Sequence, residues 1–275
     1  MARSASSTNP VNRRQTSAAL PLFLPFPTEF QGLDVQSAID LVDAEGLLPF
    51  VRHFASRASG NCARASSTGF QKEAMPAPGR FAKRFLDLLV ASIAILLLWP
   101  LMLVIAVAVK LESRGPVIYR SLRVGKRGAP FVCYKFRTMI PDANRLRKKL
   151  FHLNQRRGPF FKMSDDPRVT RLGRFLRKYS LDELPQLWNV LRGDMSLVGP
   201  RPHPLEDVAW YKPGHEERLV VTPGITGLWQ VTARANPSFE TCMLLDVGYI
   251  RNWSLLLDLK ILLRTIPAVL AGEGQ

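Results

Sequence analysis

The longest apolar stretch of the chain runs from Leu88 to Val109 and contains 22 residues without a charged side chain. At a rise of about 1.5 Å per residue, a helix of this length spans a hydrocarbon core of about 30 Å. Pro100 lies near its middle and removes one backbone donor, which kinks or breaks a helix. The pattern predicts either a kinked membrane-spanning helix or a re-entrant helix that turns and leaves by the same face.

Basic residues flank this stretch on both sides. Arg80, Lys83 and Arg84 precede it, and Lys110 and Arg114 follow it. Lys and Arg accumulate on the cytoplasmic side of membrane helices, so both ends have a cytoplasmic character. This symmetry favours the re-entrant form but leaves the spanning helix open.

Two further patterns follow the apolar stretch. Short β-rich segments at 117–119 and 131–134 surround a turn between Gly125 and Gly128, and they predict a small hairpin. Leucines recur at helical spacing among many basic residues between Asp142 and Arg157. This segment is predicted to be a basic helix, either solvated or lying on anionic lipid.

The first 79 residues are rich in Ser, Ala, Pro and Arg, and they predict a mostly disordered N-terminal extension. Between Val35 and Phe54, apolar residues recur at spacings that fit one or two short amphipathic helices. Prolines interrupt the apolar residues that follow the first arginines, so no cleavable signal peptide is expected.

The chain of 275 residues carries 38 Lys and Arg against 22 Asp and Glu, a formal net charge of +16. This charge favours an anionic partner: a phosphorylated substrate, an anionic lipid surface or nucleic acid. A nucleic-acid binder would lack a stacking pattern and would leave the apolar stretch unexplained. The three cysteines and four histidines show no metal-binding spacing.

Two adjacent acids, Asp182 and Glu183, lie within the Ser-Leu-Asp-Glu-Leu-Pro-Gln segment in a strongly basic region. Ser180 and Glu183 have the spacing of a helix capping box. Alternatively, Pro185 begins the helix and the acids lead into it. In both cases the helix dipole and nearby cations would keep at least one carboxylate ionised. That state suits a nucleophile or a metal ligand as well as a cap.

Arg201 stands between Pro200 and Pro202, which restrict the backbone on both sides. Such rigid presentation of a guanidinium suits bidentate phosphate recognition or stacking on a base, although a rigid turn with an incidental Arg is also compatible. A third segment, 223–230, has glycines where the backbone could approach a ligand closely, and Arg234 follows it.

Together these segments resemble the bacterial sugar transferase family, the monotopic polyprenyl-phosphate phosphoglycosyl transferases. The resemblance covers about residues 80–272, and it is to the compact form of the family. It rests on five segments: Lys135–Met139, Asp166–Thr170, Ser180–Gln186, Gly199–Pro202 and Pro223–Gly227. It implies an α/β monotopic membrane protein with interfacial amphipathic helices and a small irregular sheet. The implied parts are the extension of 1–79, a re-entrant membrane helix at 80–114 broken at Pro100, and a cytoplasmic catalytic domain at 115–275.

The resemblance also implies a reaction, in which a UDP-sugar donates its sugar phosphate to undecaprenyl phosphate or another polyprenyl phosphate and releases UMP. This step begins exopolysaccharide or other surface glycan assembly at the cytoplasmic face of the bacterial inner membrane. Asp182 carries over as the nucleophile of a covalent phosphosugar intermediate. Glu183 carries over as the residue that assists deprotonation of the incoming lipid phosphate or helps to hold the metal. Both carboxylates are implied ligands of the cofactor Mg²⁺. The implied phosphate-binding and nucleotide-binding residues are Lys135, Arg177, Pro200, Arg201, Pro202 and Arg234.

The implied partners are the UDP-sugar, polyprenyl phosphate and lipid of the cytoplasmic leaflet, and nucleic acid is not among them. The oligomeric state stays open, with a homodimer as one alternative. A catalytically silent membrane-tethered scaffold of the same fold is the alternative. Trp99 stands where the family often has Ser, and Ala233 where Gly is frequent. No residue identifies the sugar or the glycan pathway.

Overall fold

The computed structural model describes residues 75–141, 143–150, 163, 166–233 and 238–272. The predicted helices between Val35 and Phe54 lie outside the described residues. Most of the predicted extension does too. The expected division of the chain into an extension, a membrane helix and a catalytic domain, after residues 79 and 114, stays a prediction.

In chain order the described elements are α3 (Ala77–Glu112), β1 (Ile118–Val124), η1 (Lys126–Gly128), β2 (Pro130–Phe136), α4 (Ala143–Leu150), α5 (Arg171–Lys178), η3 (Leu181–Glu183), α6 (Gln186–Arg192), β3 (Ser196–Val198), η4 (Leu205–Trp210), η5 (His215–Val220), β4 (Gly224–Thr226), α7 (Leu228–Thr232), α8 (Phe239–Arg251) and α9 (Leu255–Leu270).

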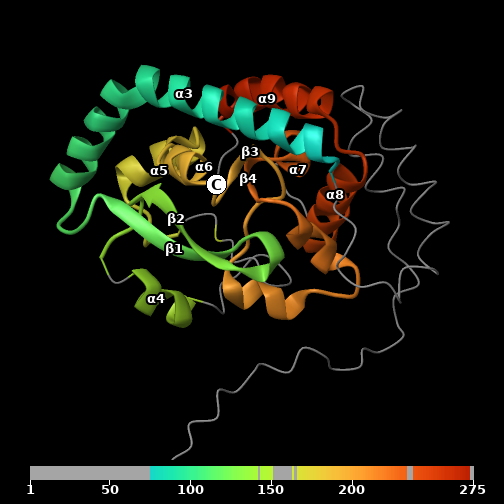
Figure 1. Cartoon of the computed structure of the whole chain (residues 1–275). Coiled ribbons are helices and arrows are strands. Elements are labelled where there is room, and N and C mark those ends of the chain that lie inside the picture. Colours follow the sequence, from blue (N-terminus) through green and yellow to red (C-terminus); the bar gives the residue numbers. More distant parts are fainter. Residues whose placement is uncertain (1–74, 142, 151–162, 164–165, 234–237, 273–275) are drawn as a thin grey trace, which may run out of the picture. The chain divides into compact units, whose positions relative to one another are not determined.

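The apolar stretch forms most of α3, a helix of 36 residues that contains Pro100. Among the described helices it is the one long and apolar enough to cross a membrane. Figure 1 shows that α3 bends along its length, so that its C-terminal part turns toward the β1–β2 hairpin. Large apolar side chains are exposed around the proline, including Leu96, Leu97 and Trp99. A soluble protein would bury such a surface, so this helix is suited to lipid.

Both ends of α3 are attached to the rest of the protein. At the N-terminal end, Arg84 donates to the carbonyls of Val190 and Leu191 at 2.6 and 3.0 Å, in the last turn of α6. At the C-terminal end, Arg137 donates to the carbonyls of Val109 and Ser113 at 3.2 and 2.6 Å. Because carbonyls at a helix end lack helical partners, each arginine stabilises the end that it contacts.

The predicted hairpin is confirmed. β1 and β2 pair antiparallel from Ile118 opposite Phe136 to Val124 opposite Pro130. The connecting turn has Arg127 and Gly128 at positive φ, 57° and 77°. Of the predicted basic helix at 142–157, α4 covers Ala143–Leu150. The remainder lies outside the described residues.

A second, parallel pair is formed by the short strands β3 and β4. Their close approach explains the glycines of this region. A Cβ at Gly224 would lie 2.1 Å from the nitrogen of Gly199, and one at Gly227 would lie 2.4 Å from the Gly199 carbonyl oxygen. Both glycines are therefore required by the neighbouring backbone, and a ligand close to this segment stays a prediction.

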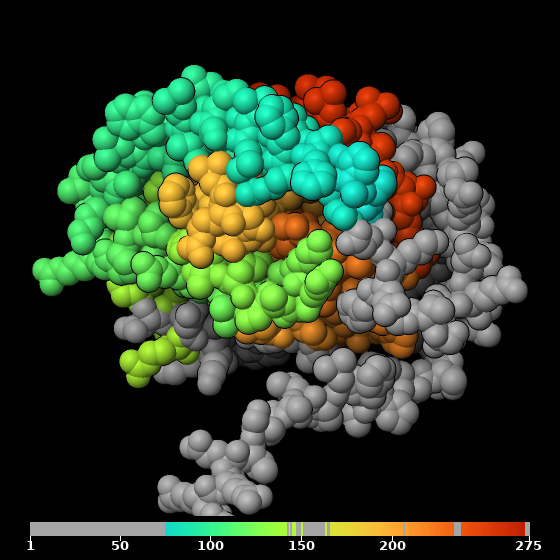
Figure 2. Space-filling view, in the orientation of Figure 1, coloured from blue at the N-terminus to red at the C-terminus, as the bar shows by residue number. Residues whose placement is uncertain are grey.

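The expected small irregular sheet is observed as two separate two-stranded sheets, surrounded by helices. A main core joins the N-terminal half of α3 to α6, β3, α7, α8 and α9, and a smaller cluster joins Ile105 and Val109 to Phe136 and Leu176. Figure 2 shows exposed side chains of α6, in yellow-orange, between α3 and the hairpin. The second half of α3 packs beside the segment that carries the acidic pair, since Leu181 and Leu184 pack against the smaller cluster.

Candidate active site

The end of β2 supplies two parts of the site. Lys135 donates to Glu183, whereas Thr138 accepts a hydrogen bond of 2.9 Å from the Nε atom of Arg177. The residues between them have structural roles: Phe136 enters the smaller core cluster, and Arg137 holds the end of α3. The segment from Lys135 to Thr138 therefore links the C-terminal end of α3 to the acids.

The acids lie on the 3₁₀ turn η3 between α5 and α6. Ser180 precedes them with φ 55° and ψ 21°, a left-handed conformation that costs a non-glycine residue about 1 kcal/mol. Ser180 makes no side-chain cap at η3, and Glu183 turns to Lys135 and Arg201. The capping-box interpretation is therefore wrong. The alternative is supported, because Pro185 directly precedes α6 and the acids lead into that helix.

Two cations hold the Glu183 carboxylate. Its Oε1 atom lies 2.6 Å from Lys135 Nζ and 2.6 Å from Arg201 Nη2, and its Oε2 atom lies 3.3 Å from Arg201 Nη1. Burial opposes the charge, but Arg201 and Lys135 outweigh it and hold the pKa of Glu183 well below its usual range. Glu183 is therefore ionised and fixed in orientation.

The neighbouring Asp182 differs. It is 7% exposed, and within the described part of the chain no group donates a hydrogen bond to its carboxylate. Burial raises the pKa of Asp182 above its ordinary value, Lys135 opposes this, and the charge of Glu183 adds to it. A buried carboxylate without a hydrogen-bond donor costs free energy. Such a group is available for a reacting partner, which Glu183 is not.

The predicted phosphate-binding residues are brought together in part. Lys135 and Arg201 contact Glu183 directly, and Arg177 lies close enough to lower the pKa of Asp182. Arg234 lies outside the described residues. In the Asp166–Thr170 segment, Arg168 pairs with Asp166 at 2.6 Å.

Sequence reasoning missed the residues that fix Arg201. Arg218 donates to the Arg201 carbonyl at 2.6 Å and to Asp246 at 2.6 Å. Arg123 donates to the Pro202 carbonyl at 3.3 Å. Both arginines belong to elements far away in the chain, so no local spacing marks them. Together with the flanking prolines, they restrain the backbone that presents the Arg201 guanidinium.

The described residues contain no group of three or more His, Cys, Asp or Glu side chains that could hold a metal ion. Asp182 and Glu183 provide carboxylate oxygens, which Mg²⁺ prefers, and Mg²⁺ commonly takes its other ligands from water and substrate phosphates. The Glu183 carboxylate already pairs with two cations, and both of its oxygens contact Arg201. A Mg²⁺ ion held by Asp182 and Glu183 together with phosphate stays a prediction.

The chain belongs to the bacterial sugar transferase family, whose model matches residues 78–272. It is 43% identical over 201 residues to the exopolysaccharide production protein ExoY of Sinorhizobium fredii, a match that covers 72% of this chain and 89% of that protein. It is 45% identical over 206 residues to a UDP-glucose:undecaprenyl-phosphate glucose-1-phosphate transferase of Caulobacter vibrioides, covering 70% and 71%.

A galactosyl transferase, CpsE of Streptococcus agalactiae, is 45% identical over 194 residues, which make up 70% of this chain and 43% of CpsE. The chain therefore spans less than half of that relative. It matches most of ExoY. The matched region of this chain contains α3, the acids and all the described cations around them.

Proposed function

We propose that the protein transfers a sugar 1-phosphate from a UDP-sugar to undecaprenyl phosphate or a similar polyprenyl phosphate at a membrane. Relatives bear names that state such reactions, with glucose 1-phosphate in one case and galactose in another. The site supports this reaction because it offers one carboxylate without a donor beside several cations. A diphosphate substrate carries the charge that those cations would neutralise.

The observation that carries the proposal is the contrast between the two acids. Glu183 is held by Lys135 and Arg201, whereas no described group donates to the Asp182 carboxylate. We assign Asp182 as the nucleophile on this basis. Glu183 then keeps the two cations in place and helps to hold the metal.

The transfer takes two displacements. An Asp182 oxygen attacks the phosphorus that bears the sugar, and the bond from that phosphorus to the oxygen bridging toward the uridine breaks. The electron pair leaves with UMP. An oxygen of the polyprenyl phosphate then attacks the same phosphorus, and the bond to Asp182 breaks. This step restores the carboxylate and forms a polyprenyl diphosphate sugar.

Mg²⁺ would neutralise diphosphate charge and so allow an anionic nucleophile to approach. The residues that would hold it are Asp182 and Glu183. Lys135, Arg177 and Arg201 would bind phosphate oxygens, because charge-assisted hydrogen bonds from such groups are among the stronger ones. Arg234 is added to these phosphate-binding residues because it follows the 223–230 segment. Pro200 and Pro202 are assigned to shaping the nucleotide site.

We further propose that α3 enters the membrane and returns by the same face, the cytoplasmic face of the bacterial inner membrane. The bend in α3 and the attachment of both its ends to one folded region support this arrangement (Figure 1). A straight spanning helix would separate its ends by the thickness of the bilayer. An exposed apolar face on α9 is suited to lie on the same surface; its residues are Leu256, Leu259, Leu263, Ile266 and Leu270.

The test is UMP release from a panel of UDP-sugars by the full chain in vesicles that contain undecaprenyl phosphate and Mg²⁺. At least one donor should release UMP, and Asp182→Asn should lower the rate by about 10³-fold or more, as is typical when a nucleophile is removed. Release with no donor would contradict the proposal and favour a scaffold of the same fold. Equal release by Asp182→Asn would remove Asp182 from its role.

A further inference from the structure

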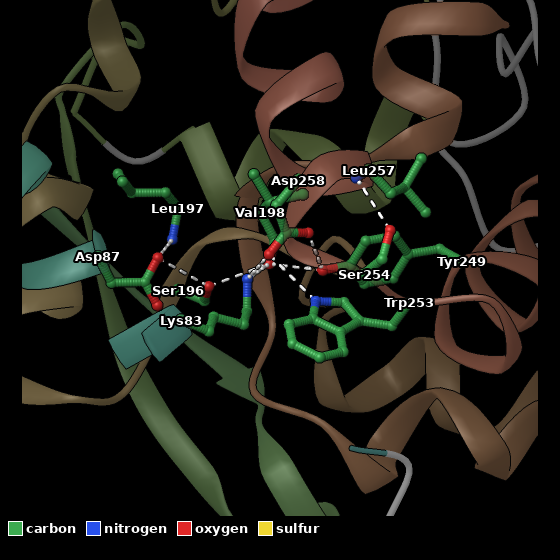
Figure 3. A network of polar contacts seen from close by, with 10 residues as sticks. All are labelled: Lys83, Asp87, Ser196, Leu197, Val198, Tyr249, Trp253, Ser254, Leu257 and Asp258. Carbon is green, nitrogen blue, oxygen red and sulfur yellow. Dashed lines mark hydrogen bonds and ion pairs between the residues drawn. The ribbon is translucent and has the colours of Figure 1, made fainter. Parts of the chain in front are cut away.

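A buried polar network joins the membrane helix to the strand that precedes Arg201. Figure 3 shows Lys83 of α3 reaching Asp258 of α9 and the backbone of β3. Lys83 Nζ lies 2.6 Å from Asp258 Oδ2 and 2.9 Å from the Val198 carbonyl oxygen. The Lys83 side chain is 10% exposed and that of Asp258 is 1% exposed. The lysine therefore connects three elements at one buried point.

Two aromatic side chains complete the surroundings of Asp258. The Tyr249 hydroxyl lies 2.7 Å from Asp258 Oδ1 and 3.2 Å from the Val198 carbonyl oxygen. Trp253 Nε1 donates to Asp258 Oδ2 at 3.1 Å. The Asp258 carboxylate thus has three donors, and the Val198 carbonyl lies at the centre of the network.

A second contact from the same helix fixes the start of β3. Asp87, one turn after Lys83, accepts hydrogen bonds from the Leu197 backbone nitrogen at 2.9 Å and from the Ser196 hydroxyl at 3.1 Å. Two side chains of α3 therefore hold β3. Asp87 binds the Leu197 nitrogen, and Lys83 binds the Val198 carbonyl. The position of β3 depends on where α3 lies.

Stability alone does not explain this network. Burying an ion pair costs desolvation energy, and well-packed apolar residues can often replace one without loss of stability. A buried pair does give its partners a fixed geometry. Here the pair fixes the Val198 carbonyl, which lies three residues before Arg201 in the chain. Only Gly199 and Pro200 stand between them. This link is short and stiff, because the proline restricts φ and the Gly199 nitrogen is bonded to the Thr226 carbonyl at 2.9 Å.

We propose that Lys83 and Asp258 are positioning residues for sugar phosphate transfer. They fix β3 to the membrane helix and so set the place of Arg201 beside Glu183. The proposal rests on the proposed function, since Arg201 is taken to bind the donor's phosphates. It follows that the placement of α3 in the bilayer is transmitted to the donor site.

The first test compares Lys83→Met with Lys110→Met. Both variants remove one positive charge from α3, but Lys110 is exposed, and its ammonium donates to the Gly115 carbonyl at 3.3 Å. In vesicles with undecaprenyl phosphate and the best UDP-sugar of the panel, Lys83→Met should lower kcat/KM for the donor by about 10-fold or more, because small misplacements in active sites cost rate steeply. Lys110→Met should stay within about 2-fold. Equal effects of the two variants would overturn the proposal.

A double-mutant cycle separates positioning from general stability. If Lys83 acts through Arg201, Lys83→Met should have little further effect on donor kcat/KM when Arg201 is already Ala. Multiplicative losses would overturn the proposal. Tyr249→Phe provides a milder variant that keeps the ring, and Lys83→Arg should recover part of the lost activity. If Lys83→Met does not fold, the same cycle is run with Tyr249→Phe.

Amide hydrogen exchange tests the link without any turnover. The peptide that contains residues 196–203 should exchange faster in Lys83→Met than in wild type and Lys110→Met. If this holds while no UDP-sugar releases UMP, the proposed function fails and the attachment of Arg201 to α3 stands. If UMP is released but exchange at 196–203 is unchanged in Lys83→Met, the proposed function stands and the positioning role fails.

Discussion

Asp182 and Glu183 are neighbours in the chain but have opposite surroundings. Lys135 and Arg201 hold Glu183, whereas Asp182 is buried and no described group donates a hydrogen bond to its carboxylate. Burial raises the pKa of Asp182, while the two cations lower that of Glu183. Different tasks for the two carboxylates follow from these environments. Glu183 organises charge, and Asp182 is the candidate for bond formation.

The pKa difference predicts the pH dependence of UMP release. Asp182 must be ionised to attack, so kcat/KM should rise with pH through its raised pKa. Lys135 lowers the pKa of Asp182. Lys135→Met should therefore move the acidic limb of the kcat/KM profile to higher pH. Lys178→Met removes an equal charge at an exposed position on α5 and should leave the limb in place; a limb unmoved by Lys135→Met would contradict the assignment.

The cations of the site differ in how far the sequence could reveal them. Arg201 is marked by the prolines on both sides, and Lys135 by its place in a motif. Arg218 and Asp246 lie 28 positions apart and form a buried pair that only the folded chain brings together. Charge patterns along a sequence do not indicate which arginines are buried. The sequence therefore marked the proposed phosphate-binding groups Arg201 and Lys135, but not the buried arginines that hold the Arg201 backbone.

At the scale of elements, β3 and β4 organise the site. Their backbones approach so closely that glycine is required, since a Cβ at Gly224 would lie 2.1 Å from the Gly199 nitrogen. The sequence identified these glycines as sites of close approach but not the partner. The helix at 77–112 and the hairpin were predictable because their apolar and turn patterns are local. The β3–β4 pairing was not, because each strand has only three residues.

Gly224→Ala should destabilise the protein by about 3 kcal/mol or more, because the clash involves backbone atoms that cannot move aside. Gly214 has open space around it but a φ of 93°. Gly214→Ala should therefore cost only the conformational strain of about 1–2 kcal/mol. Denaturant unfolding of both variants measures the difference. A smaller loss for Gly224→Ala than for Gly214→Ala would contradict the close packing of β3 and β4.

At the scale of the whole molecule, α3 is attached to the folded region near both of its ends. Arg84 and Arg137 each donate to carbonyls across these attachments. The proposed re-entrant path would keep Asp182 at the face where the phosphate of a polyprenyl lipid lies. Pro100 predicted a kink or a break, and α3 bends but runs on through it as one helix (Figure 1). The proline and the flanking charges could not choose between paths. That choice depends on contacts between the two halves of α3 and elements more than 20 residues later.

Cysteine labelling tests this path in inverted and right-side-out vesicles. In a Cys62→Ser background, Arg80→Cys and Ser113→Cys should both react with a membrane-impermeant reagent from the cytoplasmic side. Pro100→Leu should straighten the helix and make residue 80 accessible from the opposite side, because proline is the feature that bends it. Labelling of residue 80 from the outer side in the unaltered helix would contradict the re-entrant path.

The central claim is that Asp182 carries the sugar phosphate. The most direct measurement is intact-protein mass spectrometry of the full chain incubated with its UDP-sugar and Mg²⁺ in the absence of polyprenyl phosphate, followed by peptide mapping. We expect a mass increase of one sugar phosphate on the peptide that contains Asp182. The increase should be lost when undecaprenyl phosphate is added and absent in Asp182→Asn. Transfer to lipid without any adduct, or an adduct on another residue, would contradict this role of Asp182.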